Sequence, residues 1–414
     1  MTEPARRDCD VLIVGGGAVG SALACALAEL PLDTVLVEAQ EVRQLSQPGF
    51  DTRVTALANG SQQILAALSL WTELKGYTEA IRTIHISERG RFGAARISAA
   101  EERVPALGYT VENQALGRVL WERLRGAQRF TPLAPAKVLR VERHAHHVTA
   151  TIEQGGEQRE LRAKLVVAAD GARSAVRTAL GFDALEHDYE QRAVIFNCAT
   201  EAPPAGRAFE RFTSRGPIAL LPLTSGRSAV IWTLPSALAE EIAALPDDTF
   251  RAELQTAFGY RLGRFTRIGA RHLHTLVRIA SGAVHGPRAV LIGDAALRLH
   301  PVAGQGFNLA LRDVATLAEV IADALQAGGG SADVGATEPL DRYADWRAAD
   351  RERVSTFTHG LIQLFGESVP GAGLTRGIGL VAFDLLPGAK ALLARQTMGK
   401  AGRLPRLARG LPLS

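Results

Sequence analysis

Three short segments of this chain place glycines, an acid or both directly after an apolar run, an arrangement that suits binding of phosphate and sugar groups. The first is Gly15-x-Gly17-x-x-Gly20, which follows the run Val11–Val14. Glycines permit a tight turn and a close approach of the backbone to a pyrophosphate, and the start of the next helix offers free amides and a positive dipole end. We therefore predict a dinucleotide site near the beginning of the chain.

An acid follows this glycine motif at the expected distance. Glu38 ends the next apolar run, Thr34–Val37, eighteen positions beyond Gly20. An acid there can bind the ribose hydroxyls and disfavours a 2′-phosphorylated nucleotide. The alternative is a purely structural turn, and the motif alone does not separate FAD from NAD.

The second segment spells Asp170-Gly171-x-x-Ser174-x-x-Arg177 after the run Leu165–Ala168. The run predicts a buried parallel strand that delivers Asp170 to its end. A β-turn followed by a helix cap is the competing interpretation, because Asp and Ser are ordinary turn and N-cap residues.

The third segment lies nearly three hundred residues after the first, where the strand Ala289–Ile292 leads into Gly293-Asp294. Ligands of open α/β sheets bind at the carboxyl ends of the strands, where Asp294 can accept hydrogen bonds from a polyol such as a ribityl chain. A stiff glycine-rich loop and the start of a helix near Phe307 or Asn308 come next, and their candidate residues are Pro301, Gly304, Gln305, Gly306, Phe307 and Asn308. Main-chain amides in this loop can lie against a flat ligand.

Composition excludes several other classes of protein. The chain has 414 residues, of which 47% are hydrophobic, and a formal net charge of only +4, so it can bury a substantial core and is not expected to bind nucleic acid. Cys9, Cys25 and Cys198 lack the spacing of a metal site or a redox dithiol, the pair His146-His147 shows no ligand spacing, and no metal is expected. No targeting peptide and no apolar run of about 18 residues is visible. These features favour a cytoplasmic protein, with at most peripheral contact at the inner membrane surface.

The three segments together resemble the class A flavin-dependent aromatic hydroxylases, which carry them in this order on one FAD. The resemblance covers nearly the whole chain. Within that group the chain is most similar to the ubiquinone-biosynthesis hydroxylases, through Gly49-Phe50-Asp51-x-Arg53-x-x-Ala56-Leu57 and the loop His300–Leu309. Three further segments resemble the branch that hydroxylates 2-polyprenyl-6-methoxyphenols: Thr83–Ser87, Gly206–Thr213 and Glu253–Gly259.

The resemblance implies a role for each candidate residue. It assigns Gly15, Gly17, Gly20 and Glu38 to the ADP part of FAD, Arg53 and Asn113 to the flavin side, Asp170 to FAD and the nicotinamide donor, and Asp294 to the ribityl chain. Pro301, Gly304, Gln305, Gly306, Phe307 and Asn308 would border the isoalloxazine ring. His300 is the candidate acid or base beside this loop. Leu297 replaces a histidine that many members of the class carry, so no role of that histidine is carried over.

The resemblance also implies the chemistry. NAD(P)H would bind transiently and reduce the flavin, O2 would form a flavin C4a-hydroperoxide, and one oxygen would pass to a prenylated phenol. No second dinucleotide unit is present, since Gly371-x-Gly373 follows Pro370 rather than a strand. The cofactor performs the difficult step, so we expect no protein nucleophile, and the protein must orient the phenol, favour its ionised form and exclude water.

The predicted fold is α/β, with a Rossmann-type FAD-binding domain, an intertwined and mainly β substrate domain, and C-terminal helices. The FAD-binding domain takes residues 1–75, 105–180 and 285–330. The substrate domain takes residues 76–104 and 181–284, and the C-terminal helical region takes residues 331–414. The last stretch carries six basic residues without an acid, namely Lys390, Arg395, Lys400, Arg403, Arg406 and Arg409. Such a tail can contact an anionic bilayer or remain a solvated end.

Three alternatives remain from the sequence. A flavin-dependent halogenase shares the fold, but the chain lacks the Trp-x-Trp signature of that group. A sister hydroxylase acting at another ring position of the same pathway is not separated by these patterns. A catalytically idle flavoprotein in a quinone-synthesis complex is the third, although a scaffold has no need to keep a flavin site open.

Overall fold

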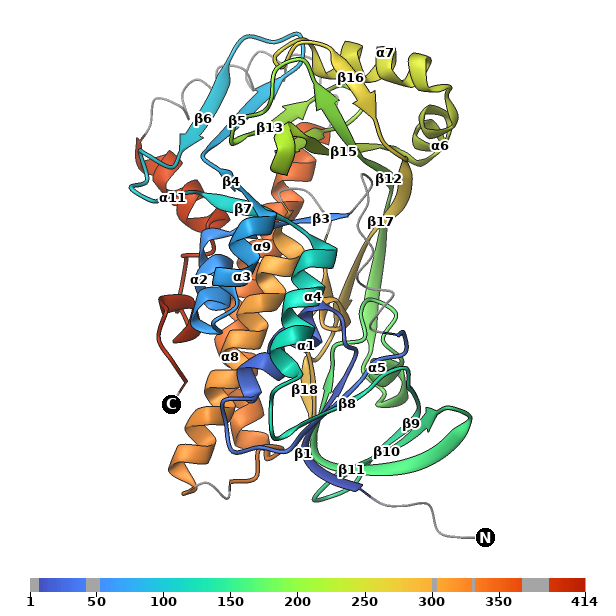
Figure 1. Cartoon of the computed structure of the whole chain (residues 1–414), viewed down its shortest axis with the longest axis vertical. Coiled ribbons are helices and arrows are strands. Elements are labelled where there is room, and N and C mark those ends of the chain that lie inside the picture. The colour runs from blue at the N-terminus through green and yellow to red at the C-terminus, as the bar shows by residue number, and fades with distance from the viewer. Residues whose placement is uncertain (1–6, 42–52, 300–303, 330–331, 367–386, 414) are drawn as a thin grey trace.

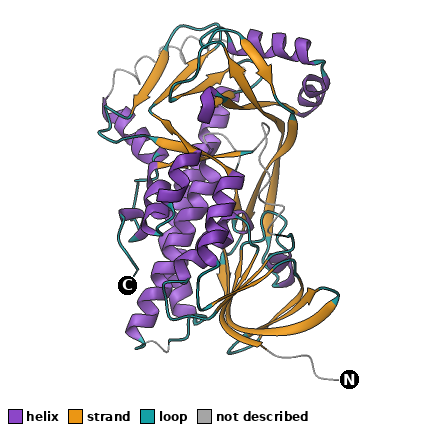
Figure 2. Cartoon of the chain, in the orientation of Figure 1, coloured by secondary structure: helices purple, strands orange, loops and turns teal. Residues whose placement is uncertain are grey.

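The computed structural model describes residues 7–41, 53–299, 304–329, 332–366 and 387–413, and of residues 357–366, 387 and 389 it describes the backbone only. The chain forms an elongated body with a sheet at either end and long helices packed along its middle (Figure 1). Figure 2 shows that most helices gather on one side of the lower sheet and below the upper one. This arrangement agrees with the predicted α/β fold.

The lower sheet carries the first, second and third sequence segments on adjacent parallel strands. Its order is β18-β19-β11-β1-β2-β8, and β10 and β9 extend it beside β11. Its central strand runs parallel to both neighbours, with Val11 opposite Leu165 and Thr34. The bounds are β1 (Arg7–Val14), β2 (Thr34–Val37), β8 (Phe130–Leu133), β9 (Lys137–Arg143), β10 (Val148–Gln154), β11 (Glu157–Ala168), β18 (His285–Gly286) and β19 (Ala289–Leu291).

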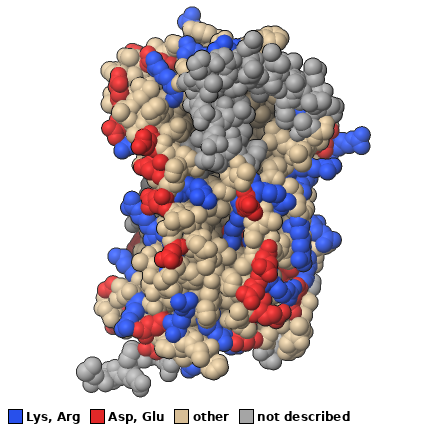
Figure 3. All heavy atoms as spheres, turned by 180° about the vertical axis from the view of Figure 1, so that it is seen from behind, with Lys and Arg blue, Asp and Glu red and all other residues tan. Residues whose placement is uncertain are grey.

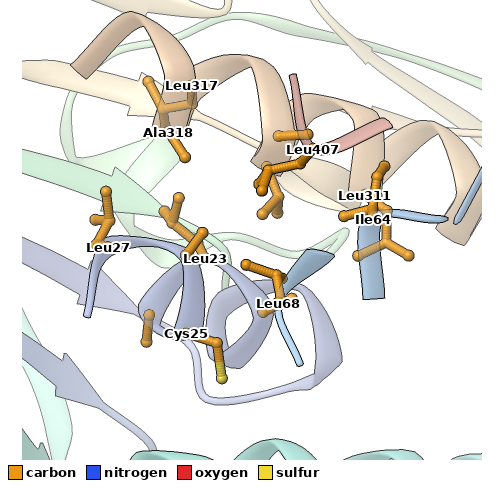
Figure 4. Packing of buried hydrophobic residues seen from close by; sticks show 14 of the residues in the cluster. Leu23, Cys25, Leu27, Ile64, Leu68, Leu311, Leu317, Ala318 and Leu407 are labelled. Carbon is orange, nitrogen blue, oxygen red and sulfur yellow. The ribbon is translucent and has the colours of Figure 1, made fainter. Parts of the chain in front are cut away.

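The parallel strands of this sheet are apolar on both faces, so both faces must be buried. A layer of helices covers one of them. Leu23 and Leu27 of α1 pack near Leu317 and Ala318 of α8, and Leu407 from the C-terminal stretch joins the same core (Figure 4). The helices of this layer are α1 (Ala18–Leu27), α2 (Asn59–Ala67), α3 (Trp71–Leu74), η2 (Lys75–Tyr77), α4 (Asn113–Leu124), α8 (Gln305–Ala327), α9 (Thr337–Gly366) and η6 (Leu407–Arg409). α11 (Pro387–Thr397) instead packs near Ile97 of the upper sheet. α5 (Ala175–Ala179) lies on the other side of the lower sheet, and η4 (Gly293–Ala295) follows β19 and contacts α8.

The upper sheet has the order β20-β17-β12-β15-β14-β13-β5-β6, with β16 paired to β12. Two helices cover its outer face, so this predicted β region also contains helical structure: α6 (Ser236–Ala244) and α7 (Asp247–Phe258). Its elements are β5 (Thr83–Glu88), β6 (Ala94–Ser98), β12 (Ala184–Thr200), β13 (Arg207–Phe212), β14 (Ile218–Pro222), η3 (Thr224–Gly226), β15 (Ser228–Pro235), β16 (Phe265–Ile268), β17 (His272–Ser281) and β20 (Leu297–Arg298). A small sheet of β3 (Val54–Ala58), β7 (Gly108–Glu112) and β4 (Thr78–Ile81) lies between the upper sheet and the helices (Figure 1).

A buried ion network joins the two long helices α8 and α9. Asp313 accepts from Arg347 Nε at 2.7 Å and pairs with Arg351 at 3.1 Å, and Arg312 Nε donates to Asp350 at 2.8 Å. All five residues are buried. Buried charges are tolerated only when they are paired, so this network specifies how α9 docks on α8.

The basic C-terminal stretch is docked on the protein, which corrects the expectation of a solvated end and leaves contact with a bilayer as a prediction. Arg406 pairs with Asp323 and Glu319 of α8, and Arg403 lies 3.7 Å from the ring centroid of Trp346. Leu407 belongs to the buried core. The prediction was wrong because the acids that neutralise the stretch lie 83 and 87 positions away in the sequence.

Two further observations concern the surface. Among the described helices, none is both long enough and apolar enough to cross a membrane. On the back face of the molecule, basic and acidic side chains are interspersed over the described part (Figure 3).

Candidate cofactor site and the apolar wall above it

The turn between β1 and α1 contains glycines that are needed for two different reasons. Gly15 has φ +107°, and a Cβ there would lie 2.4 Å from the carbonyl oxygen of Ala169. A Cβ on Gly20 would lie 1.9 Å from the carbonyl oxygen of Gly15. A Cβ on Gly17 would have no protein atom within 4 Å, although Gly17 is the N-cap of α1 and provides no side-chain cap. Packing therefore requires Gly15 and Gly20, whereas the space at Gly17 suits a phosphate that approaches an uncapped helix N-terminus.

Glu38 lies at the end of β2, directly beside this turn. Its carboxylate accepts hydrogen bonds from the main-chain N–H of Gly16 at 2.6 Å and of Gln40 at 2.8 Å. Trp121 of α4 donates to the carbonyl oxygen of Gly16 at 3.2 Å, which holds the other side of the turn. A carboxylate has about four acceptor positions, so two bonds leave capacity for ribose hydroxyls.

The second segment combines a structural and an open part. Ser174 caps α5 by accepting from the N–H of Arg177 at 2.9 Å, as the helix-cap interpretation predicts. Arg177 is buried and donates to the carbonyl oxygens of Ala295 at 3.0 Å and Ala172 at 2.8 Å, so it ties this segment to the third one. Asp170 accepts one weak bond from the N–H of Val176 at 3.3 Å, while its buried Oδ1 has no hydrogen-bond partner among the described residues.

The third segment is held between two helices. Gly293 has φ +58°, and a Cβ there would lie 3.2 Å from Val19 of α1 and 3.5 Å from Ala310 of α8. The carboxylate of Asp294 is exposed and forms no hydrogen bond with the described residues. Desolvation by the surrounding protein nevertheless raises its pKa, against the opposing charge of Arg298. A carboxylate that solvent reaches and that has no protein partner can accept hydrogen bonds from a polyol of a cofactor.

The start of α8 is fixed by one buried amide. Asn308 Oδ1 accepts from the N–H of Ala58 and from Ser61 Oγ, both at 2.7 Å, and Nδ2 donates to the carbonyl oxygens of Ala56 at 2.9 Å and Gly304 at 2.8 Å. This side chain is thus occupied within the protein, and a cofactor contact by Asn308 would have to use its main chain. Asn308 fastens the beginning of α8 to the small central sheet.

The loop that is predicted to border the flavin, residues 301–308, is only partly described, and we call it the flavin-side loop. Gly304 has φ +59° and a Cβ there would lie 3.3 Å from Ala56 of β3, while a Cβ on Gly306 would meet nothing within 4 Å. Gln305 is buried and Phe307 is half-buried against the helical core. The candidates His300 and Pro301 lie outside the described residues, as do residues 49–51 and Gly371-x-Gly373.

Arg53 and Asn113 lie side by side, as expected for two residues on the same side of a cofactor. The N–H of Asn113 donates to the carbonyl oxygen of Arg53 at 2.9 Å, and Thr55 Oγ1 donates to Asn113 Oδ1 at 2.7 Å. Both residues are exposed. The pKa of His274 in β17 is lowered first by burial and second by the positive charge of Arg53. Arg53 therefore also lies near the upper sheet.

The end of β14 in the upper sheet is linked to this site by a series of contacts. Thr110 of β7 donates from its hydroxyl to the carbonyl oxygen of Pro222 in β14, and in the small sheet Thr110 pairs with Ala56 of β3. Ala56 in turn is the neighbour of Gly304 in the flavin-side loop. A chain of contacts therefore runs from the C-terminal end of β14 through β7 and β3 to the start of α8.

The central strands of the upper sheet have one sealed face and one open face. On the outer face, Ile218, Leu220, Val230 and Trp232 are fully buried under α6 and α7. On the inner face, Ala193, Asn197, Ala229 and Thr233 are buried, but four apolar side chains are only half-buried: Ile195, Ala219, Leu221 and Ile231. We call this inner set the apolar wall. Half-exposed aliphatic residues on one face of a sheet are typical of a site for an apolar ligand.

Two titratable side chains at the edges of the apolar wall were not singled out from the sequence. Glu210 of β13 pairs with Ala219 of β14 on the inner face, and His274 of β17 pairs with Ala193 of β12. Both residues fall in the predicted mainly β region of residues 181–284, but the alternation of side chains along a strand does not say which side faces a ligand. In the described part of the chain, no group of three or more His, Cys, Asp or Glu residues could hold a metal ion.

The residues present fit FAD. The open space at Gly17, the buried and unpartnered Oδ1 of Asp170 and the unbonded carboxylate of Asp294 are three features that the described residues do not use. They occur at the carboxyl ends of β1, β11 and β19, which are neighbours in one sheet. A long nucleotide along this edge would supply partners to all three.

Comparisons with known proteins agree with this geometry. Residues 8–358 match the family described as FAD binding domain. The crystal structure of p-nitrophenol 4-monooxygenase PnpA from Pseudomonas putida superposes with a TM-score of 0.78 at 19% identity, covering 96% of this chain and 100% of that one. The fold and the site thus define an FAD-binding class A monooxygenase, and the predicted fold class is confirmed.

Curated relatives narrow the class. Ubiquinone hydroxylase UbiL from Rhodospirillum rubrum is 38% identical over 100% of this chain and 95% of its own length. The 3-demethoxyubiquinol 3-hydroxylase of Escherichia coli is 32% identical over 91% of this chain and 94% of its own length. The chain belongs to the ubiquinone hydroxylase family of FAD-dependent aromatic monooxygenases. Its cofactor is FAD, with NAD(P)H as electron donor and O2 as co-substrate, as the resemblance implied.

Proposed function

We propose that this chain hydroxylates a polyprenylated phenol in ubiquinone biosynthesis, converting 2-polyprenyl-6-methoxyphenol to 2-polyprenyl-6-methoxy-1,4-benzoquinol. The apolar wall is the observation that carries the proposal, because a prenylated ring needs an extended aliphatic surface beside the flavin-side loop. The names of the two relatives supply the class of substrate.

The protein's own residues have separate tasks in this proposal. Gly15, Gly17, Gly20 and Glu38 hold the ADP part of FAD, Asp294 holds its ribityl chain, and Asp170 lies between them. Arg53, Asn113 and the segment Gly304–Asn308, preceded by Pro301, border the flavin. Bound FAD, reduced by NAD(P)H, supplies the two electrons with which one atom of O2 enters the ring and the other becomes water. The apolar wall orients the phenol and excludes water from it.

A second candidate is the sister reaction at another ring position of the same pathway. The relative from Escherichia coli, whose name specifies hydroxylation of 3-demethoxyubiquinol at position 3, aligns over nearly its whole length. Both substrates carry a prenylated, oxygenated ring, and an aliphatic wall accepts either. The orientation of the ring against the flavin decides between them.

Several expectations stay predictions beside this proposal. They are the domain division at residues 75, 105, 180, 285 and 330, the roles of individual cofactor-contacting residues, a catalytic role for His300, and peripheral membrane contact or membership of a quinone-synthesis complex. A cytoplasmic location stays a prediction as well.

Product analysis tests the proposal directly. The purified FAD-loaded protein is supplied with NADH or NADPH, O2 and either a short-chain 2-prenyl-6-methoxyphenol or a short-chain 3-demethoxyubiquinol, and the products are identified by mass spectrometry and NMR. One added oxygen para to the phenol hydroxyl supports the first candidate. Oxygen added only to the second substrate assigns the sister reaction, and oxygen uptake without hydroxylation of either refutes both.

A further inference from the structure

Glu210 is a carboxylic acid on the otherwise apolar inner face of β13 and β14. Its neighbour Phe209 points to the opposite side, where its ring contacts Phe258 of α7 at a centroid distance of 5.6 Å. Because successive side chains of a strand alternate, Glu210 points to the inner face. There it pairs laterally with Ala219 of β14 and Ile86 of β5. The acid therefore belongs to the apolar wall.

The carboxylate has no partner in the described part of the chain. It forms no hydrogen bond and no ion pair with a described residue, and its side chain is only half-buried. Burial is the cause that raises the pKa of Glu210 from its ordinary value of 4.5 to about 7. An ionisable group in apolar surroundings is costly unless a partner is supplied, so its presence in the wall points to a polar group on the ligand.

Few charged groups surround this acid. On the inner face, Glu88 of β5 lies opposite Phe212, two positions along β13 from Glu210. β14 contributes no charged residue. From α11, which packs near Ile86, the charged side chains are Lys390, paired with Glu101, and Arg395. Burial is nevertheless the cause of the raised pKa, rather than any of these charges.

His274 is the competing acid or base at the other edge of the wall. Burial is the largest cause that lowers its pKa, and the positive charges of Arg53, His272 and Arg298 lower it further. Arg298 also acts on Asp294 in the third sequence segment. His274 thus belongs to the positively charged surroundings of the cofactor edge, whereas Glu210 lies among aliphatic residues where a prenylated ring would be held.

We propose that Glu210 is a catalytic residue that accepts the proton of the substrate's phenol hydroxyl. This inference rests on the proposed function and names a base for it. The phenol O–H bond breaks, its electron pair stays on oxygen as phenolate, and the proton forms the neutral acid of Glu210. The electron-rich ring then accepts one oxygen atom, and the proton held by Glu210 is available for the water formed from the other, with NAD(P)H as the two-electron reductant.

The matched variants are Glu210→Gln, which keeps the shape and removes the acid, Glu210→Asp, which keeps the acid, and Glu186→Gln, which changes an exposed glutamate on β12 of the same sheet. Flavin content and the thermal midpoint are measured first for all of them. Product formation, NAD(P)H oxidation and O2 uptake are then followed between pH 5.5 and 9 with the prenylated phenol that the wild type hydroxylates.

We expect Glu210→Gln to bind FAD and oxidise NAD(P)H while product per O2 consumed falls at least about tenfold, since proton transfer by a positioned base is worth about 10²-fold or more. The wild-type rise of product formation near pH 7 should disappear in Glu210→Gln and persist in Glu210→Asp and Glu186→Gln. Binding supplies an independent readout. The wild type should bind the phenol more tightly than its methyl ether, which has no proton to give, and Glu210→Gln should lose most of this preference.

The outcomes separate this inference from the function on which it rests. A wild type that hydroxylates no prenylated phenol refutes the proposed function. A wild type that hydroxylates, together with a Glu210→Gln variant of unchanged coupling, pH profile and phenol preference, overturns the role of Glu210 and leaves the function intact.

Discussion

Replacing Glu210 by glutamine should stabilise the protein at alkaline pH while it impairs hydroxylation. Folding raises the pKa of Glu210 from 4.5 to about 7. Each pKa unit corresponds to about 1.4 kcal/mol. The ionised acid therefore destabilises the folded chain by about 3 kcal/mol, an upper bound because solvent still reaches part of the side chain.

The sign of the effect follows from proton binding in the two states. Below the unfolded pKa of 4.5 the group is protonated in both states, and its charge has no influence on stability. Between pH 4.5 and about 7 the unfolded chain releases the proton and the folded chain keeps it, so the free energy of unfolding falls as pH rises. Above about pH 7 both states are ionised and the full difference remains. Glutamine lacks this dependence.

The difference in unfolding free energy between Glu210→Gln and wild type should be about 1 kcal/mol at pH 5 and about 3 kcal/mol at pH 8. Urea unfolding of both proteins with equal, saturating FAD, followed by circular dichroism at the two pH values, measures it. Glu186→Gln, on an exposed strand position, should show less than about 0.5 kcal/mol at either pH. A difference for Glu210→Gln that is the same at pH 5 and pH 8, or that favours the wild type more at pH 8, would refute the reasoning.

The remaining predictions concern the cofactor edge and the helical core. Gly17→Val should fold normally but bind FAD at least about tenfold more weakly. Gly20→Val should impair folding itself, because only at Gly20 would the added Cβ meet the protein backbone. Equal thermal midpoints for the two variants would contradict this prediction. Asp294→Ala should weaken FAD binding by about 10- to 100-fold, the loss expected for hydrogen bonds to a charged group. The apo-protein should unfold as the wild type does. Fluorescence titration with FAD measures the affinity, and full flavin retention removes Asp294 from the site. Asp313→Ala should lower the unfolding free energy by about 3–5 kcal/mol, since it leaves Arg347 and Arg351 buried without this acid. Asp248→Ala, in an exposed pair, should lower it by less than about 1 kcal/mol. Similar denaturant midpoints for the two variants would show that the network is not needed.

Much of the cofactor-binding half was predictable because its signals are local. An apolar run, the glycine turn after it and the acid that ends the next strand are contiguous in the chain, and they predicted β1, the start of α1 and the position of Glu38. The strand before Asp294 was found for the same reason, whereas Asn113 was assigned only through the family resemblance. Backbone conformation in such segments depends mainly on neighbours within a few residues.

Other features could not be read from the chain because their partners are distant in sequence. Arg177 was identified as part of a motif, but its role as a bridge to Ala295 depends on a residue 118 positions away. The basic C-terminal stretch was interpreted as free because the acids that bind Arg406 belong to α8. The side of β13 that faces the ligand depends on which face α7 covers.

The sequence by itself determined where the glycine turn after β1 and the two acid-bearing strand ends occur, since each is written in residue types and spacings over a short stretch. Only the tertiary structure decided that Gly17 leaves open space while Gly20 is packed, that Asn308 is occupied by protein partners, and that Glu210 faces an apolar wall. The physical reason is that steric room, hydrogen-bond satisfaction and desolvation are set by atoms that folding brings together from distant parts of the chain.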